Sequence, residues 1–264
     1  MSPAGKPVCL ITGASSGIGA ALAREFARHG HALVLTARRQ AELDALADSI
    51  GRNGKPRPEV IAADIGTAAG IDRLAGELAG RGLDVAILVN NAGFGLLGPA
   101  AELDLAQQLA MIDLNVRALT DLTLRFTGSV IRHKGGILNV ASIAGFMPGP
   151  GMAVYHASKA FAVSFSEAMH QELKAEGVRV TALCPGPVPT PFMAHAGIPR
   201  GYFPSVLARP AERVAREGYA GLMAGRRVVV PGGPNRLVTV LPRLLPRGLI
   251  AGYTAWRWRR SRRG

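Results

Sequence analysis

Short apolar runs alternate along the chain with longer segments in which apolar residues recur every three or four positions. The first run, 6–12, is mostly apolar, which is typical of a strand buried on both faces of a sheet. Regular alternation of such strands with amphipathic helices predicts an α/β fold with a doubly wound parallel sheet. The predicted strands are 6–12, 32–36, 59–63, 84–89, 136–141 and 178–183, and the predicted helices are 20–29, 40–50, 66–81, 102–126 and 152–176.

The composition fits one large globular domain or two small ones. The chain has 264 residues, of which 48% are hydrophobic and 19% charged, and a core of this size needs no disulfide or metal. Cys9 and Cys184 lie in strand-like runs, so we expect buried, reduced thiols in a cytoplasmic protein and no metal site. Neither a signal peptide nor a membrane-spanning run is expected.

The positive charge is concentrated at one end. The net charge is +13, yet no acidic residue follows Glu217, whereas ten arginines do. The preceding part, with 21 basic and 18 acidic residues, is close to neutral. The high charge therefore describes the C-terminal segment and says little about the predicted α/β domain.

Three glycines follow the first predicted strand at the spacing G-x3-G-x-G. Gly13 would permit a tight turn, Gly17 would let the backbone approach a pyrophosphate, and Gly19 would let the next helix pack closely on the strand. The helix would direct free N–H groups and the positive end of its dipole at the anion. A glycine-rich turn alone is also a common structural feature; the strand–turn–helix order favours phosphate binding.

Side chains at the ends of the next strands suit the rest of a dinucleotide. In proteins that bind NAD(H), an acidic residue after the second strand binds the ribose hydroxyls. This chain has Arg38 and Arg39 after the second predicted strand. A guanidinium group suits the extra phosphate of NADP(H). The alternative is a solvated arginine pair. Asp64 could accept from an adenine amino group or cap a turn. Asn90–Asn91–Ala92–Gly93 could admit a flat ligand or form an ordinary turn.

A tyrosine and a lysine share one face of the helix predicted at 152–176. Tyr155 and Lys159 are four residues apart, so the ammonium group could stabilise a phenolate and lower a pKa that is ordinarily about 10. Ser142, at the end of a strand, could hold a substrate oxygen beside the phenol. Such a pair also occurs on ordinary surface helices. Asn115, inside a predicted helix, could satisfy a buried carbonyl or distort the helix.

All of these strand-end residues should meet, because ligands of parallel sheets bind at the carboxyl ends of the strands. With the residues assembled, the chain resembles a short-chain dehydrogenase/reductase over roughly residues 6–230. The motifs that carry the resemblance are Thr12–Gly13–Ala14–Ser15–Ser16–Gly17–Ile18–Gly19, Asn90–Asn91–Ala92–Gly93, Ser142 with Tyr155-x-x-x-Lys159, Asn115, and Pro185–Gly186–Pro187–Val188–Pro189–Thr190. The C-terminus is most similar to broad-specificity bacterial reductases with an extended end.

The resemblance implies a role for each matching residue. Tyr155 would be the general acid in reduction and the base in oxidation, and Lys159 would lower its pKa and hold the nicotinamide ribose. Ser142 would orient the carbonyl, and Asn115 would anchor a water relay. The implied cofactor-binding residues are Thr12, Gly13, Ser15, Ser16, Gly17, Ile18, Gly19, Arg38 (2′-phosphate), Asp64 (adenine), Ile65, Asn91, Ala92, Gly93, Tyr155, Lys159, Pro185, Gly186, Val188 and Thr190.

The resemblance also implies architecture. It adds a seventh strand at 227–230, the sheet order 3-2-1-4-5-6-7, and a homodimer or homotetramer. We expect a single Rossmann-fold domain at 1–230 that includes a substrate loop at 186–210, and a basic amphipathic extension at 231–264. The loop is mostly apolar from Thr190 to Pro210, which favours a hydrophobic substrate over a charged sugar.

The extension carries apolar residues at helical spacing. Leu237, Leu241 and Leu244 form one set and Leu249, Tyr253 and Trp256 another. Because Pro242, Pro246 and Gly248 interrupt them, we predict two short amphipathic helices and a frayed end at 257–263. Arginine beside tryptophan suits an anionic membrane surface, and a protein interface or a solvated end is the alternative. Nucleic-acid binding is disfavoured because the patch is confined to one terminus and contains no known module.

The sequence thus predicts an NADP(H)-dependent oxidoreductase that transfers a hydride between nicotinamide and a small hydrophobic carbonyl or secondary alcohol. The ketone, ketoacyl or steroid-like substrate is left open, as is the use of NAD(H). The alternative is a catalytically silent, cofactor-binding protein associated with a membrane.

Overall fold

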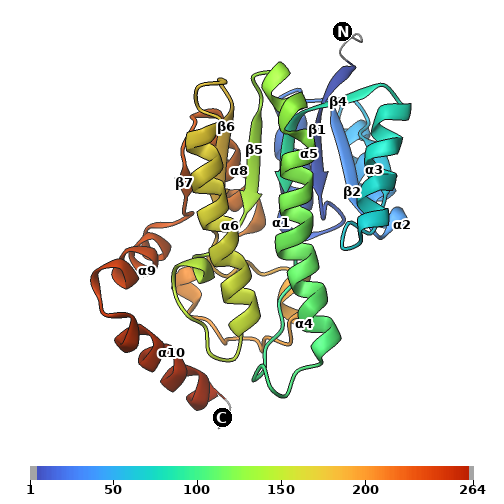
Figure 1. Ribbon diagram of the computed structural model, residues 1–264. Helices are drawn as coiled ribbons and strands as arrows, with labels where there is room; N and C mark the ends of the chain where they lie inside the picture. Colours follow the sequence, from blue (N-terminus) through green and yellow to red (C-terminus); the bar gives the residue numbers. More distant parts are fainter. Residues whose placement is uncertain (1–4, 262–264) are drawn as a thin grey trace.

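A seven-stranded parallel sheet forms the centre of the molecule in the computed structural model, which describes residues 5–261 (Figure 1). The strand order β3-β2-β1-β4-β5-β6-β7 confirms the predicted topology. The seventh strand is shorter than expected. The strands are β1 (Lys6–Thr12), β2 (Leu33–Ala37), β3 (Glu59–Ala62), β4 (Leu83–Asn90), β5 (Gly136–Val140), β6 (Arg179–Leu183) and β7 (Val228–Val229).

Helices cover both faces of the sheet, because the central strands are apolar on both sides. On one face, Leu22 and Phe26 belong to a core shared with Leu43 and Leu222; on the other, Leu122 packs among strand residues. Burying each such side chain stabilises the fold by about 1.5–3 kcal/mol. The first layer contains α1 (Gly17–Arg28), α2 (Gln40–Arg52) and α8 (Ala211–Met223), and the second α3 (Ala68–Gly80), α5 (Leu119–Arg132) and α6 (Ala153–Glu172).

The helix predicted at 102–126 is wrong in its bounds and its regularity. It begins as α4 (Leu105–Ile112), where the Asp104 carboxylate caps it by accepting from the Gln107 N–H at 2.8 Å. A π-helical stretch, η1 (Asp113–Ala118), follows, and α5 then continues to Arg132. Asn115 lies inside this π-helical stretch, so the helix is irregular at the residue that the sequence singled out. That Asn115 itself causes the distortion stays a prediction.

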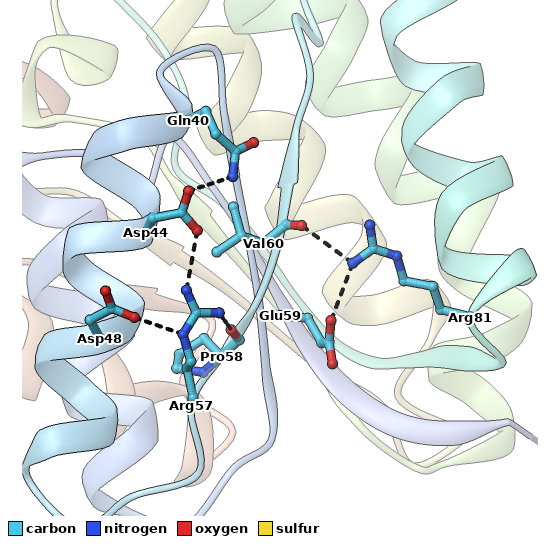
Figure 2. Close-up of polar contacts among 8 residues, drawn as sticks. All are labelled: Gln40, Asp44, Asp48, Arg57, Pro58, Glu59, Val60 and Arg81. Atoms are coloured by element: carbon cyan, nitrogen blue, oxygen red, sulfur yellow. Dashed lines mark hydrogen bonds and ion pairs between the residues drawn. The ribbon is translucent and has the colours of Figure 1, made fainter.

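Polar contacts fix the edge strand β3. Arg57, in the preceding loop, ion-pairs with Asp44 and Asp48 of α2 at 3.2 and 2.7 Å (Figure 2). At the other side Arg81 binds the Glu59 carboxylate at 3.2 Å and the Val60 carbonyl at 3.3 Å. Each exposed ion pair contributes about 0–1 kcal/mol. Their joint effect is to hold the edge of the sheet near the second and third helices.

The C-terminal part returns to the end of the sheet at which the strands finish (Figure 1). The loop at 186–210 contains α7 (Pro191–His195) and η3 (Ser205–Leu207), and a short turn, η2 (Ile143–Phe146), follows β5. Two further helices, α9 (Gly233–Leu244) and α10 (Arg247–Ser261), confirm the predicted pair. No described helix has the length and hydropathy required to cross a membrane.

Of the three predicted interruptions, Pro246 does lie between α9 and α10, whereas the other two are wrong. Pro242 lies inside α9 and Gly248 inside α10, and the stretch predicted to be frayed is helical up to Ser261. Pro242 lies in the last turn of α9, where the missing N–H removes only one helical hydrogen bond. Arg262 and Arg263 lie outside the described residues.

Candidate active site

One continuous cavity of about 1470 Å³ runs along the carboxyl ends of the strands, from the glycine-rich turn to the C-terminal helices. It brings together most of the residues predicted from the sequence, whereas Thr12, Gly19 and Asn115 do not line it. The predicted residues that line it are Gly13, Ser15, Ser16, Gly17, Ile18, Arg38, Asp64, Ile65, Asn91, Ala92, Gly93, Ser142, Tyr155, Lys159, Pro185, Gly186, Val188 and Thr190.

The glycine-rich turn between β1 and α1 is built to receive an anion. Gly13 and Gly17 have φ angles of +64° and +58°, a region that favours glycine. Ser16 precedes α1 without a side-chain cap, so the first helical N–H groups are available to a phosphate group. Gly19 lies behind the turn against the Gly13 carbonyl. Its role is to allow close packing of helix on strand.

A second set of contacts joins the ends of β1 and β4. The hydroxyl oxygen of Thr12 accepts hydrogen bonds from the N–H groups of Asn91 and Ala92, each at 3.0 Å. The Asn91 amide donates to the Thr12 and Gly13 carbonyls at 2.8 and 3.2 Å. Thr12 therefore positions the glycine-rich turn from behind and has no surface in the cavity.

The two arginines after β2 have different surroundings. Both line the cavity, but Arg39 is held by the turn. Its Nη2 donates to the hydroxyls of Ser15 and Ser16 at 2.9 and 3.3 Å, and its Nη1 lies 3.4 Å from the Glu42 carboxylate. Arg38 is exposed. Asp64 follows the neighbouring strand β3 and lines the same cavity as the two arginines. Its carboxylate accepts a hydrogen bond from the Gly66 N–H at 3.1 Å.

The hydroxyl, phenol and ammonium groups of the predicted catalytic set lie in one buried part of the cavity. Ser142, at the end of β5, hydrogen-bonds Tyr155 through its side chain. The Lys159 Nζ donates to the Val140 carbonyl at 2.9 Å and lies 5.9 Å from the centre of the Tyr155 ring. Burial lowers the pKa of Lys159 to about 8. It therefore carries a charge at neutral pH.

Burial dominates the pKa of the phenol in this structure, and the role of Lys159 in lowering that pKa stays a prediction. Burial raises the pKa of Tyr155 to about 12, and the hydrogen bond with Ser142 opposes this increase only in part. Desolvation disfavours the phenolate by more than the neighbouring groups favour it. Tyr155 is consequently a protonated donor at neutral pH.

Asn115 connects three elements from outside the cavity. Its amide donates to the Phe94 carbonyl at 2.9 Å and to the Ser158 hydroxyl at 3.0 Å, and its oxygen accepts from the Phe94 N–H at 3.1 Å. Asn115 thus ties the loop after β4 to the helix that carries Tyr155. These bonds occupy its side chain, and the water relay that the resemblance implies stays a prediction.

Sequence reasoning missed a buried polar ladder beneath the site. The Asn90 amide donates to the Asn139 oxygen at 2.9 Å and to the Thr123 hydroxyl at 3.0 Å, and the Asn139 amide donates to Ser166 at 2.9 Å. The available signal was Asn139, a polar residue in an otherwise apolar run. Such a ladder fixes β4, β5 and α6 relative to one another.

Fold and site together define a dinucleotide-binding α/β oxidoreductase: an anion-binding turn, a basic group and an acid–base pair follow one another along one cavity. The sequence model of the family described as short chain dehydrogenase matches residues 7–199. The chain belongs to the short-chain dehydrogenase/reductase family, which confirms the resemblance.

The relatives include enzymes with different stated activities. The chain is 39% identical over 188 residues to sulfoacetaldehyde reductase 2 from Chromohalobacter salexigens, covering 70% of this chain and 74% of that protein. It resembles a short-chain dehydrogenase from Sphingobium yanoikuyae in complex with NADPH, with 32% identity, a TM-score of 0.80 and coverage of 93% and 95%. It also resembles the bulky-bulky ketone specific alcohol dehydrogenase from Comamonas testosteroni, with 29% identity, a TM-score of 0.75 and coverage of 90% and 93%.

These comparisons establish an oxidoreductase of the CH–OH class with a nicotinamide cofactor. Because the stated activities range from sulfoacetaldehyde to bulky ketones, family membership alone does not assign a substrate. Nothing in the comparisons supports the alternative of a catalytically silent, membrane-associated protein.

Proposed function

We propose that the protein is an NADP(H)-dependent reductase of hydrophobic ketones or aldehydes, with Tyr155 as the general acid. The observation that carries this proposal is the placement of Ser142, Tyr155 and Lys159 in the same cavity as the glycine-rich turn and Arg38. The family relationship supports the reaction class. The geometry of the cavity supports the proposed role of each residue.

The residues present fit the cofactor. The turn at Gly13–Gly17 would receive the pyrophosphate, Asp64 the adenine, and Lys159 the nicotinamide ribose. Gly93 lines the cavity and packs against Asn115, since a Cβ there would lie 2.8 Å from the Asn115 oxygen. Arg38 and Arg39 at the adenine end, without an acidic residue directly after β2, support NADP(H) over NAD(H).

The chain's own residues then perform the acid–base chemistry. Bound NADPH would supply the hydride to the carbonyl carbon. Tyr155, with its pKa raised to about 12, keeps its proton until the developing alkoxide draws it away. Ser142 would donate a hydrogen bond to the same oxygen, and the charge on Lys159 would stabilise the phenolate that results. In the oxidation direction Tyr155 would accept the proton.

The surroundings of Tyr155 support a hydrophobic substrate. Its ring centre lies 5.6 Å from that of Phe192 in α7. Met152, Ala196 and Ile198 are buried beside it, and further loop residues pack against them. An apolar pocket with few polar groups at its base is typical of sites that bind apolar ligands.

The absorbance of NADPH tests the proposed reaction. We expect purified protein to oxidise NADPH on addition of apolar ketones or aldehydes, and Tyr155→Phe to lower kcat by about a hundredfold or more, since the proton donor is removed. Binding of NADPH, measured by its fluorescence, should persist in the variant. Equal turnover by both proteins would remove Tyr155 from the mechanism.

The predicted homodimer or homotetramer is also proposed. Its support is a set of large apolar side chains that stand exposed on helices of one face. They are Leu105, Leu109 and Ile112 in α4, Leu124 in α5 and Phe161 in α6. The cytoplasmic location and the division of the chain after residue 230 stay predictions.

We further propose peripheral contact of the C-terminal helices with anionic membranes. Leu237, Val240, Leu244 and Trp256 are exposed and are not among the residues that line the cavity. Arg260 lies 5.6 Å from the Trp256 ring. Each basic residue near an anionic bilayer adds about 1 kcal/mol of attraction.

Sedimentation with vesicles tests this contact. We expect the protein to pellet with phosphatidylserine vesicles more than with phosphatidylcholine vesicles, and Leu244→Asp to reduce pelleting, because a carboxylate resists transfer into the interface. NADPH binding by the variant is the control for folding. Equal pelleting with both lipids would reject the contact.

A further inference from the structure

The C-terminal extension is anchored to both sides of the cavity mouth. At the start of α9, Asn235 is fully buried and its amide donates to the Leu207 carbonyl at 3.1 Å and to the Pro231 carbonyl at 2.8 Å. A Cβ at Gly186 would lie 2.5 Å from the Asn235 oxygen. The helix therefore begins in direct contact with the substrate loop and with the segment at 185–190.

The far end of the extension contacts the substrate loop again and also the segment before α6. In α10, the Arg257 Nη2 donates to the Tyr202 carbonyl of the substrate loop at 3.1 Å. The Trp258 ring lies against Gly151, directly before the catalytic helix, where a Cβ would come within 2.5 Å of the ring. Gly151 has a φ of +82°. Both its conformation and the indole therefore require glycine at this position.

Between these anchors the extension presents apolar side chains to the cavity that contains Tyr155. Leu249 and Tyr253 line the cavity although they are 63% and 60% exposed. Among the described side chains of the extension that line it, Arg257 alone is charged, and it is bonded to the backbone. The lining residues are Val238, Leu241, Pro242, Leu245, Leu249, Ile250, Tyr253, Thr254, Arg257 and Trp258.

We infer that α9 and α10 form the distal wall of the substrate chamber and select carbonyl compounds with a long, uncharged apolar body. This inference rests on the proposed reductase function. The carbonyl group lies at Tyr155 and the apolar body extends along the substrate loop to α10, where it covers Leu249, Tyr253 and Trp258. The continuity of this apolar wall with the catalytic cavity identifies the substrate as its occupant.

The dependence of turnover on chain length tests the wall. A homologous series of methyl ketones, from acetone to methyl nonyl ketone, is reduced with NADPH. Burial of a methylene group contributes about 0.8 kcal/mol, so we expect kcat/KM of the wild type to rise about fourfold per methylene. Trp258→Ala should flatten this slope for the longer members and leave acetone unaffected.

The matched control is Trp256→Phe, on the same helix but outside the lining. It keeps an aromatic ring beside Tyr253, on which Trp256 stacks, and should keep the wild-type slope. Equal slopes for Trp258→Ala and Trp256→Phe would overturn the inference. So would a wild-type slope that does not rise with chain length.

A binding measurement separates this inference from the proposed reaction. The chain has two tryptophans, so Trp256→Phe leaves Trp258 as the fluorescent reporter. We expect methyl nonyl carbinol, titrated without NADPH, to change the emission saturably, and isopropanol at equal concentration to leave it unchanged. That result without turnover of any ketone would contradict the reaction and support the chamber. An unchanged emission with methyl nonyl carbinol would overturn the chamber.

Discussion

At the scale of single residues, the two arginines after β2 differ in what they contact. Arg39 is tied to Ser15, Ser16 and Glu42, so it supports the turn that would receive the pyrophosphate. Arg38 is exposed and lines the same cavity. We therefore expect Arg39 to affect the binding of both cofactors and Arg38 to affect the choice between NADPH and NADH.

Substitution of each arginine distinguishes the two roles. We expect Arg38→Ala to raise the KM for NADPH by about tenfold or more and to leave that for NADH unchanged, because hydrogen bonds to charged groups contribute about 1.5–3 kcal/mol. Arg39→Ala should raise the KM for both cofactors, since the turn that both share is loosened. Steady-state kinetics with each cofactor measures this. Equal effects of Arg38→Ala on both would contradict its role with the phosphate.

The sequence predicted residue types better than their contacts. Tyr155, Lys159 and Ser142 were found because their chemistry and spacing are local features. The contact between Arg39 and the glycine-rich turn depends on how two strand ends approach each other, and no local pattern reports it. The raised pKa of Tyr155 likewise follows from burial, which a sequence position does not disclose.

At the scale of elements, the π-helical stretch between α4 and α5 helps to position α6, the helix that carries Tyr155. It turns the Asn115 side chain, 2% exposed, toward Phe94 and Ser158, and so joins η1 to the loop after β4 and to α6. The sequence indicated an irregularity through an asparagine in a helix. It did not indicate the partners, which lie 21 and 43 residues away along the chain.

Removal of this side chain should destabilise the protein. Asn115→Ala removes the hydrogen bonds of Asn115 with the part-buried backbone of Phe94 and with the buried Ser158 hydroxyl, and the loss of a buried partner costs about 1–3 kcal/mol. We expect the free energy of unfolding, measured in urea, to fall by at least about 2 kcal/mol. Asn53→Ala, at an exposed helix end, is the control and should change it by less than about 0.5 kcal/mol. Equal effects of the two substitutions would contradict the connecting role.

At the scale of the whole molecule, the alternation of strands and helices predicted the parallel sheet, and the family resemblance predicted the order of its strands. The location of the site was predicted because ligands of parallel sheets bind at the carboxyl ends of the strands. The position of the extension was not predicted. Its two helices were predicted from periodicity, but their return to the cavity depends on single long-range contacts, such as Arg257 with the Tyr202 carbonyl, 55 residues away along the chain. Some apolar residues of the extension line the cavity, whereas others are exposed outside it. The periodicity of the sequence predicts the helices but does not predict which of their residues line the cavity.

The central claim is that the protein catalyses hydride transfer from NADPH to the carbonyl carbon of a hydrophobic ketone or aldehyde. Transfer of an isotope from the cofactor to the product tests this claim most directly. Wild-type protein is incubated with methyl nonyl ketone and NADPH that carries deuterium at the transferable position of the nicotinamide, and the product is analysed by mass spectrometry. We predict methyl nonyl carbinol with one deuterium at the carbinol carbon. Alcohol without deuterium, or no alcohol from any apolar ketone or aldehyde, would contradict the account.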